Sequence, residues 1–98
     1  MKIKKTESNN SIQLNVSGRL DATSAPELEE EIMSALEQDI RELIFDFAEL
    51  DYISSAGLRL LLVARRGMKN KGTVRVIHVQ NEVQEIFDMS GFSDILNI

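Results

Sequence analysis

Hydrophobic and polar residues alternate one by one near the start of the chain. Over residues 11–17, three aliphatic side chains are separated by single polar residues, which is typical of a strand with one buried face. Gly18 is expected to end this strand. Residues 2–6 carry a weaker form of the same pattern and are expected to form an opening strand. The pattern therefore predicts two successive strands, the first of them an antiparallel edge.

The spacing of the apolar residues then changes to that of an amphipathic helix. From Leu28 to Leu36 apolar side chains recur every three or four positions, which predicts a helix over residues 25–38. Ser24 is a suitable N-cap residue, and Glu27, three residues later, is placed as its capping-box partner. The helix is therefore expected to begin directly after Ser24.

Two further apolar runs, residues 43–47 and 73–79, predict strands. The first run is almost entirely apolar and is expected to be a central strand that is covered on both faces. Between the two runs, the turn-like residues 48–52 lead into a helix that extends to about Asn70. Gly72 is a candidate for the residue that follows the C-terminus of that helix.

The last part of the chain predicts a short helix from about Asn81 to Ser90, then a terminal strand or extended tail over residues 94–98. The resulting order is β-β-α-β-α-β-α-β. Strands that alternate with helices are connected by right-handed crossovers, which give a mostly parallel sheet with helices packed on it. We therefore expect one α/β domain over residues 1–98, with about five strands and three or four helices.

Composition limits the chemistry that this domain can perform. The sequence has 98 residues, a formal charge of −5, no cysteine and one histidine, His78. Disulfides, thiolate zinc sites and multi-histidine metal clusters are therefore excluded. The only long apolar run, Leu60–Ala64, is far shorter than the roughly 20 residues that span a bilayer. No apolar stretch follows the lysines at the start, so we expect no signal peptide, no membrane insertion and a cytoplasmic location.

The charges are segregated along the sequence. Residues 20–51 hold one base and eleven acids, whereas residues 52–81 hold six bases and no acid. One interpretation is two solvated helix faces of opposite sign. The other is a polarised surface that steers a protein partner toward the molecule. Direct binding of nucleic acid is not expected, because the basic residues are not interleaved with aromatic ones.

Ser54 and Ser55 lie at a predicted strand-to-helix junction. One serine there is explained by capping, since serine is a preferred N-cap residue. Two adjacent serines are redundant as caps, which leaves one hydroxyl free. A phosphate added to it would lie at the positive end of the helix and would add about −1.5 to −2 charges. Gly57 would allow the backbone of another chain to approach closely.

The helix that follows these serines is unusually apolar. Leu58, Leu61 and Leu62 form a stripe that is expected to face the core, but Leu60 and Val63 lie off this stripe. The helix is then either buried on two sides, or it presents an apolar patch beside the serines at which a partner docks. The sequence pattern leaves both interpretations open.

Three segments together resemble STAS domains, specifically bacterial anti-sigma-factor antagonists. Residues 50–58, Leu-Asp-Tyr-Ile-Ser-Ser-Ala-Gly-Leu, resemble the signature of that family. Residues 17–28 resemble its Gly-x-Leu-Asp turn into the first helix, and residues 86–92 resemble its late Phe-Asp-Met-Ser-Gly-Leu segment. The resemblance covers the chain from about residue 11 onward and implies a STAS-type fold.

The resemblance also implies a function. In that family, the unphosphorylated antagonist binds an anti-sigma factor, which is often a GHKL-type serine kinase, and a sigma factor is released. The kinase phosphorylates the antagonist and ends the complex, and a PP2C-type phosphatase resets the switch. The resemblance places the phosphoacceptor at Ser55. Ser54 stands where the family usually has Asp and is an alternative acceptor, and Ala56 stands where it usually has Ser or Thr.

Other residues near this position are expected to contact the partner. Asp21 matches the turn aspartate of the family, which lies near the phosphorylation site, although a purely structural turn or cap aspartate fits the sequence equally well. The complete expected partner surface consists of Asp21, Thr23, Ser54, Ser55, Gly57, Leu58, Arg59, Leu60 and Val63.

Two other classes of function compete with this one. An enzyme is not expected, because the serines lack a Gly-x-Ser-x-Gly context, no phosphate-binding loop occurs, and His78 near Arg75 is expected to be a satisfied strand residue. No cofactor or metal is expected either. The second alternative is a STAS subunit of a larger assembly, such as a lipid-transport ATPase complex or a stress-signalling scaffold, without a phosphorylation cycle.

Overall fold

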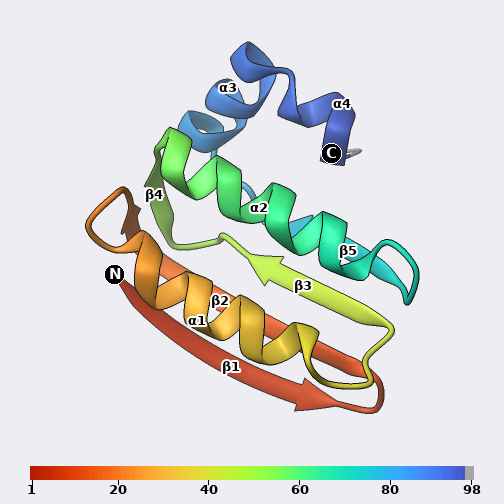
Figure 1. The fold of residues 1–98 in the computed structure, drawn as a ribbon. Coiled ribbons are helices and arrows are strands. Elements are labelled where there is room, and N and C mark those ends of the chain that lie inside the picture. Colours follow the sequence, from red (N-terminus) through yellow and green to blue (C-terminus); the bar gives the residue numbers. More distant parts are fainter. Residues whose placement is uncertain (97–98) are drawn as a thin grey trace.

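The computed structural model describes residues 1–96 as one α/β sandwich (Figure 1). The elements in chain order are β1 (Lys2–Ser8), β2 (Ser11–Leu20), α1 (Ala25–Leu36), β3 (Glu42–Asp46), β4 (Leu50–Ile53), α2 (Ser55–Met68), β5 (Thr73–Ile77), α3 (Asn81–Ser90) and α4 (Phe92–Leu96). The α/β class, the number of strands and the three long helices are those that the sequence predicts.

The sheet is built around β2. This strand pairs antiparallel with β1 along one edge. Along its other edge it pairs parallel with β3 over its first half and with β4 at its end. β3 pairs parallel with β5 on its far side, so β3 is a central strand, as predicted. The mostly parallel sheet and the antiparallel first strand are therefore confirmed. The predicted cover on both faces of β3 is wrong, because only Leu43 and Phe45, on one face of β3, are fully buried.

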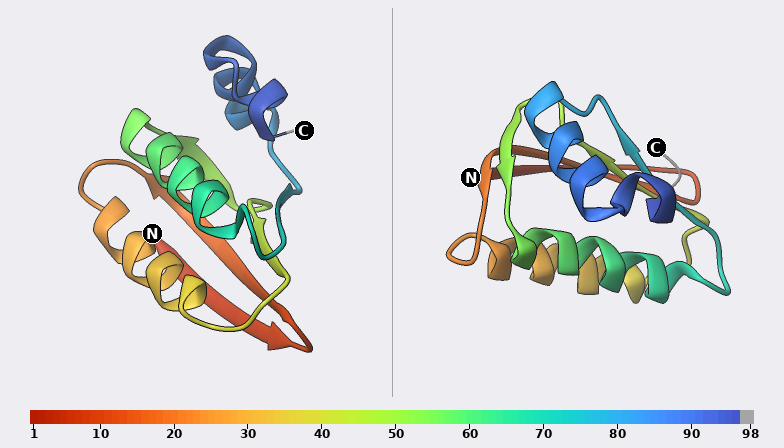
Figure 2. Two further views of the ribbon diagram at one scale, coloured as in Figure 1. Left: turned by 45° about the vertical axis from the view of Figure 1, so that its right-hand side comes forward. Right: turned by 90° about the horizontal axis from the view of Figure 1, so that it is seen from above.

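One face of the sheet carries the core. Ile12, Leu14 and Val16 of β2 alternate with polar residues and are almost completely buried, as the alternation predicts. Helices α1 and α2 pack side by side over this face (Figure 2). Helix α3 packs against β4 at the edge of the sandwich and contributes the fully buried Phe87. Among residues 1–96, no polar or charged residue is buried as a whole.

The fifth strand of the sheet is not the one that the sequence suggests. Residues 48–52 were expected to form a turn, but Leu50–Ile53 form β4 and pair with the end of β2. The C-terminal residues 94–98 were expected to be extended, but Phe92–Leu96 form helix α4. Residues 97 and 98 lie outside the described part of the chain. The fifth strand therefore lies directly before the two serines.

Two glycines act differently from the prediction. Gly18 does not end β2: it adopts a φ of 89° at a bulge, and the strand continues to Leu20. Gly72 does not adopt the left-handed conformation of a residue that follows a helix. It is instead required by a close approach, since a Cβ atom there would lie 1.9 Å from the carbonyl oxygen of Arg41. The extension of β2 brings the chain to Asp21 at the carboxyl edge of the sheet.

Candidate functional site

The carboxyl ends of two neighbouring parallel strands bring the predicted site residues together. Leu20 at the end of β2 is paired with Ile53 at the end of β4. The backbone amide of Ser54 donates a hydrogen bond of 2.9 Å to the carbonyl oxygen of Leu20. The loop that starts at Asp21 therefore lies beside the start of helix α2, although more than 30 residues separate the two segments in the sequence.

The two serines at this junction have different environments. Ser54 has extended backbone at the N-cap position, and its carbonyl oxygen accepts a hydrogen bond of 2.9 Å from the amide of Leu58. Its hydroxyl oxygen is enclosed and has no hydrogen-bond partner among residues 1–96. Ser55 is the first residue of α2 and its side chain is exposed. Only the hydroxyl of Ser55 is therefore openly accessible to another protein.

Asp21 organises the loop between β2 and α1. Its Oδ1 atom accepts hydrogen bonds from the backbone amides of Thr23, at 3.0 Å, and Ser24, at 3.2 Å. The hydrogen bond from the amide of Ser24 is the main cause that lowers the pKa of the Asp21 carboxyl below its usual value, and the one from Thr23 acts in the same direction. The interpretation of Asp21 as a structural turn residue is confirmed. Thr23 is exposed at the tip of this loop.

The capping box predicted for helix α1 is wrong. The hydroxyl of Ser24 donates a hydrogen bond of 2.8 Å to the carbonyl oxygen of Arg19 and accepts one of 3.0 Å from the amide of Asp21. It makes no hydrogen bond to the helix, and Glu27 does not pair with it. Ser24 therefore fastens the loop to the end of β2 instead of capping α1.

Gly57 serves the packing of α2 and does not face a partner. It is buried, and a Cβ atom at this position would lie 2.7 Å from the side chain of Ile53 and 2.8 Å from that of Leu20. The close approach expected between Gly57 and another chain is instead an approach within this one. Leu58 is also buried, with 9% of its surface exposed.

Leu60 was expected to lie on an apolar surface patch, and this expectation is wrong. Its side chain is completely buried, in the same cluster as Val83 and Phe87 of helix α3. The alternative that α2 is buried on two sides holds instead, because Leu60 is as fully buried as Leu61 of the stripe that was predicted to face the core. Val63 is partly buried and packs against this cluster. The exposed part of the expected partner surface is therefore smaller than predicted, because Gly57, Leu58 and Leu60 are buried.

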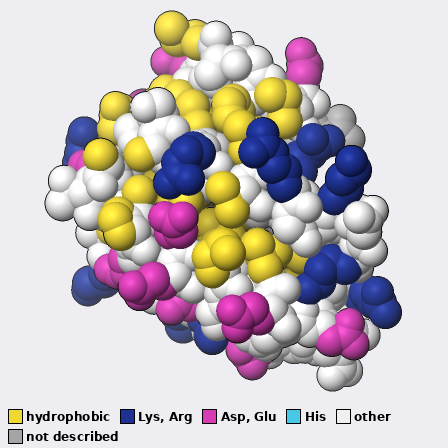
Figure 3. Space-filling view, in the orientation of Figure 1, with side chains coloured by type: hydrophobic (Ala, Val, Ile, Leu, Met, Phe, Trp, Pro, Cys, Tyr) yellow, Lys and Arg dark blue, Asp and Glu magenta, His cyan; other side chains and the backbone are white. Residues whose placement is uncertain are grey.

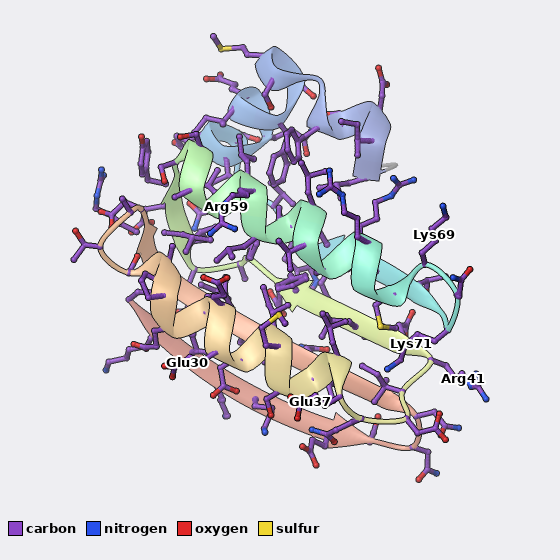
Figure 4. The ribbon with its side chains drawn as sticks, viewed as in Figure 1. Glu30, Glu37, Arg41, Arg59, Lys69 and Lys71 are labelled. Atoms are coloured by element: carbon purple, nitrogen blue, oxygen red, sulfur yellow. The ribbon has the colours of Figure 1, made fainter. Side chains whose placement is uncertain are left out.

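Arg59 is the exposed charged residue nearest to Ser55 along α2. Its side chain is labelled in Figure 4. Its Nη2 atom lies 3.7 Å from Oε1 of Glu29, so that it links α2 to α1. On the other side of the junction, the guanidinium of Arg19 lies over the ring of Tyr52, 4.2 Å from its centre. Sequence reasoning missed Arg19, Glu29 and Tyr52. Their pairing depends on the position of β4 and on the packing of α1 against α2.

The segregation of charge along the sequence is also visible on the surface. Acidic side chains gather over α1 and basic ones over α2, with apolar side chains between them (Figure 3). A cavity of about 480 Å³ lies at the C-terminal part of α2, between that helix, β5 and α4. Its lining includes Arg65, Arg66 and Lys69 and none of the predicted site residues. This cavity is therefore separate from the residues around Ser55.

The single histidine is engaged elsewhere. His78 follows β5 with a φ of 58°, so it is not within the strand as predicted, and its Nδ1 atom lies 3.1 Å from Oδ2 of Asp46. Residues 1–96 contain no group of three or more side chains that could hold a metal ion. No helix in this part of the chain has the length and apolar character needed to cross a membrane.

Relatives of this chain match most of its length and carry related names. A Bordetella bronchiseptica protein, BtrV, named as a candidate anti-sigma factor antagonist, is 35% identical over 82 residues, which cover 83% of this chain and 71% of BtrV. The anti-sigma-B factor antagonist of Bacillus subtilis is 30% identical over 95 residues, which cover 94% of this chain and 84% of that protein.

Solved structures share the fold. An anti-sigma factor antagonist from Mycobacterium paratuberculosis superimposes with a TM-score of 0.88 at 18% identity, over 96% of this chain and 80% of that one. Unphosphorylated SpoIIAA gives a TM-score of 0.81 at 19% identity, over 92% of this chain and 81% of its own. The phosphorylated form of Bacillus SpoIIAA gives a TM-score of 0.72 at 20% identity, over 95% of this chain and 86% of its own. The STAS domain family model matches residues 2–98, and the chain belongs to the STAS domain family.

Proposed function

We propose that this STAS domain is an anti-sigma-factor antagonist whose activity is controlled by phosphorylation of Ser55. In this proposal the unphosphorylated domain binds an anti-sigma factor that is also a GHKL-type serine kinase, and a sigma factor is released. Phosphorylation dissociates the complex, and a PP2C-type phosphatase restores the binding form. The names of the relatives support the role of antagonist, and the phosphorylated form of SpoIIAA shows that a protein of this fold carries the modification.

The observation that carries the proposal is the difference in accessibility between the two serines. The hydroxyl of Ser54 is enclosed, whereas Ser55 is exposed at the first position of α2. A kinase has to bring the acceptor oxygen into line with the γ-phosphate of ATP, which requires an accessible hydroxyl. Ser55 meets this requirement without any change of the fold, and Ser54 does not. Ser55 is therefore the proposed acceptor.

The physical effect of a phosphate at this position supports a switch. A phosphoserine carries about −1.5 to −2 charges at neutral pH. An interface that covers Ser55 would have to desolvate this charge or hold it against the nucleotide of the kinase, and either costs several kcal/mol. Each 1.4 kcal/mol weakens binding about tenfold, so no rearrangement of the domain is needed to end the complex.

The test uses the GHKL-type serine kinases encoded in the source genome. Each purified kinase is incubated with ATP and with the wild-type, Ser55→Ala or Ser54→Ala domain, and the phosphate is located by mass spectrometry. We expect one kinase to modify the wild-type and Ser54→Ala domains at Ser55 and to leave Ser55→Ala unmodified. We also expect Ser55→Ala to keep binding that kinase and Ser55→Asp to bind at least about tenfold more weakly.

Other results would reject this function. A phosphate on Ser54, or normal binding of Ser55→Asp, would contradict the proposed acceptor. If none of the kinases bound or modified the domain, while a transporter or scaffold protein was recovered in a stable complex with it, the domain would be a subunit of a larger assembly instead.

A further inference from the structure

Arg59 lies where it can bind a phosphoryl group on Ser55. The two residues are separated by four positions on α2, and both are exposed. Residues with this spacing lie on the same helix face, with their Cβ atoms about 5–6 Å apart. Long side chains on a helix lean toward its N-terminus, so Arg59 leans toward Ser55. The reach of the arginine side chain covers the remaining distance.

The present partner of Arg59 holds it only weakly. Its Nη2 atom lies 3.7 Å from Oε1 of Glu29, which is too long for a good hydrogen bond. The side chains of Arg59 and Glu29 are 58% and 42% exposed. Exposed ion pairs of this kind contribute little to stability, because water and salt screen them. Arg59 can therefore leave Glu29 at small cost.

A phosphate is a better partner for arginine than this carboxylate. The guanidinium presents parallel N–H groups that match two phosphate oxygens, and the charges of a phosphoserine exceed that of one glutamate. On these grounds, and resting on the proposed function, we propose that Arg59 binds the phosphoryl group of Ser55 and releases Glu29 of α1. Arg59 is then the positioning residue for the phosphate within this chain.

The exchange would change the charges offered to a partner on two helices at once. In the unphosphorylated domain, Arg59 and Glu29 bridge α2 and α1. In the phosphorylated domain, the guanidinium is occupied by the phosphate and the carboxylate of Glu29 is left free. The carboxylate of Asp21 at the neighbouring loop is already engaged by backbone amides. A partner that recognises the unphosphorylated surface would then face the new phosphate, and the guanidinium of Arg59 would no longer be available to it.

The experiment incorporates phosphoserine at position 55 during synthesis, by genetic-code expansion, so that no kinase is needed. The second ionisation of the phosphate is followed by ³¹P NMR as the pH is varied, in the wild-type, Arg59→Gln and Arg66→Gln backgrounds. Arg66 is a matched control, because it is an exposed arginine on the same helix but lies about two turns farther from Ser55 than Arg59 does. Circular dichroism checks that each variant is folded.

We expect Arg59→Gln to raise the pKa of the phosphoserine by about 0.5 unit, the effect of losing one exposed charged partner, and Arg66→Gln to raise it much less. Glu29→Gln should lower it slightly or leave it unchanged, because it removes the competitor for Arg59. Equal pKa values in the Arg59→Gln and Arg66→Gln backgrounds would overturn the role of Arg59. This result is independent of the kinase assays, so failure of one proposal is distinguishable from failure of the other.

Discussion

A methyl group on Gly57 would lie only 2.8 Å from Cγ of Leu20. This contact means that the first turn of α2 rests directly on the end of β2. The position of Ser55 relative to the loop of Asp21 depends on it, because Gly57 lies two residues after Ser55 in the same turn. The glycine therefore fixes the geometry of the proposed site from the inside of the molecule.

We predict that Gly57→Ala lowers the free energy of unfolding by about 1–3 kcal/mol, because the overpacking outweighs the better helix propensity of alanine. Urea denaturation measures the difference. Gly67→Ala in the same helix is the control. The three atoms nearest to a Cβ atom there all belong to the side chain of the partly exposed Leu36, which can move, so the loss should be smaller. A larger loss in Gly67→Ala would contradict the account of Gly57.

Leu60→Ala should lower the free energy of unfolding by about 2–5 kcal/mol, because it leaves a cavity in a fully buried cluster. Leu62→Ala, at a partly exposed position of the same helix, should lose clearly less. Thermal or urea denaturation of both variants checks the comparison. Equal losses would mean that Leu60 is not part of the core.

The carboxyl of Asp21 should make stability depend on pH. Its pKa is lowered from 3.8 in the folded domain, so the unfolded chain binds the proton more tightly. The stability that Asp21 contributes is therefore present above pH 3.8 and is lost as the pH falls through the lower folded pKa. We expect the difference in stability between the wild type and Asp21→Ala to shrink over this acidic range.

Urea denaturation at a series of pH values measures this dependence. Asp21→Asn is the control, because it keeps an acceptor oxygen but cannot take up a proton in this range. The difference between wild type and Asp21→Asn should also change with pH, whereas that between Asp21→Asn and Asp21→Ala should stay constant. A constant difference between wild type and Asp21→Ala would contradict the prediction.

Two glycines outside the site should respond to alanine for different reasons. At Gly72 a Cβ atom would lie 1.9 Å from the carbonyl oxygen of Arg41, which is backbone and cannot rotate away. At Gly91 the space is open, but the φ of 79° disfavours alanine by about 1–2 kcal/mol. Gly72→Ala should therefore destabilise the domain more than Gly91→Ala in calorimetry, and Gly91→Asn should be milder than Gly91→Ala. The reverse order at Gly72 and Gly91 would contradict this.

Elements with a clear period could be predicted from the sequence. The alternation in β2 and the helical spacing in α1 each report which face is buried, because a single core lies on one side of the element. Strand β4 has only four residues, with Leu50 and Ile53 buried at its two ends, so it shows no alternation that the sequence could reveal. The sequence pattern therefore predicts a turn where the structure has this strand.

The errors at the site arise from neighbours that are remote in sequence. Leu60 is buried in the core cluster, whose members come from elements between β2 and α3. The hydroxyl of Ser24 donates to the carbonyl oxygen of Arg19 and therefore does not cap α1. Arg59 of α2 pairs with Glu29, which lies on the other helix, α1. None of these contacts follows from spacing within one element. The resemblance located Ser55, and the structure added which surrounding residues are accessible.

The burial of three residues in the first turns of α2 restricts how such domains can diverge from one another. Gly57, Leu58 and Leu60 are committed to the interior, so they are not free to change with the partner. In a cell with several domains of this fold, only exposed residues such as Thr23 and Arg59 could differ between them. These residues would have to make each domain bind its own partner and not the partner of another domain. A small number of surface substitutions would then suffice to separate one signalling circuit from another.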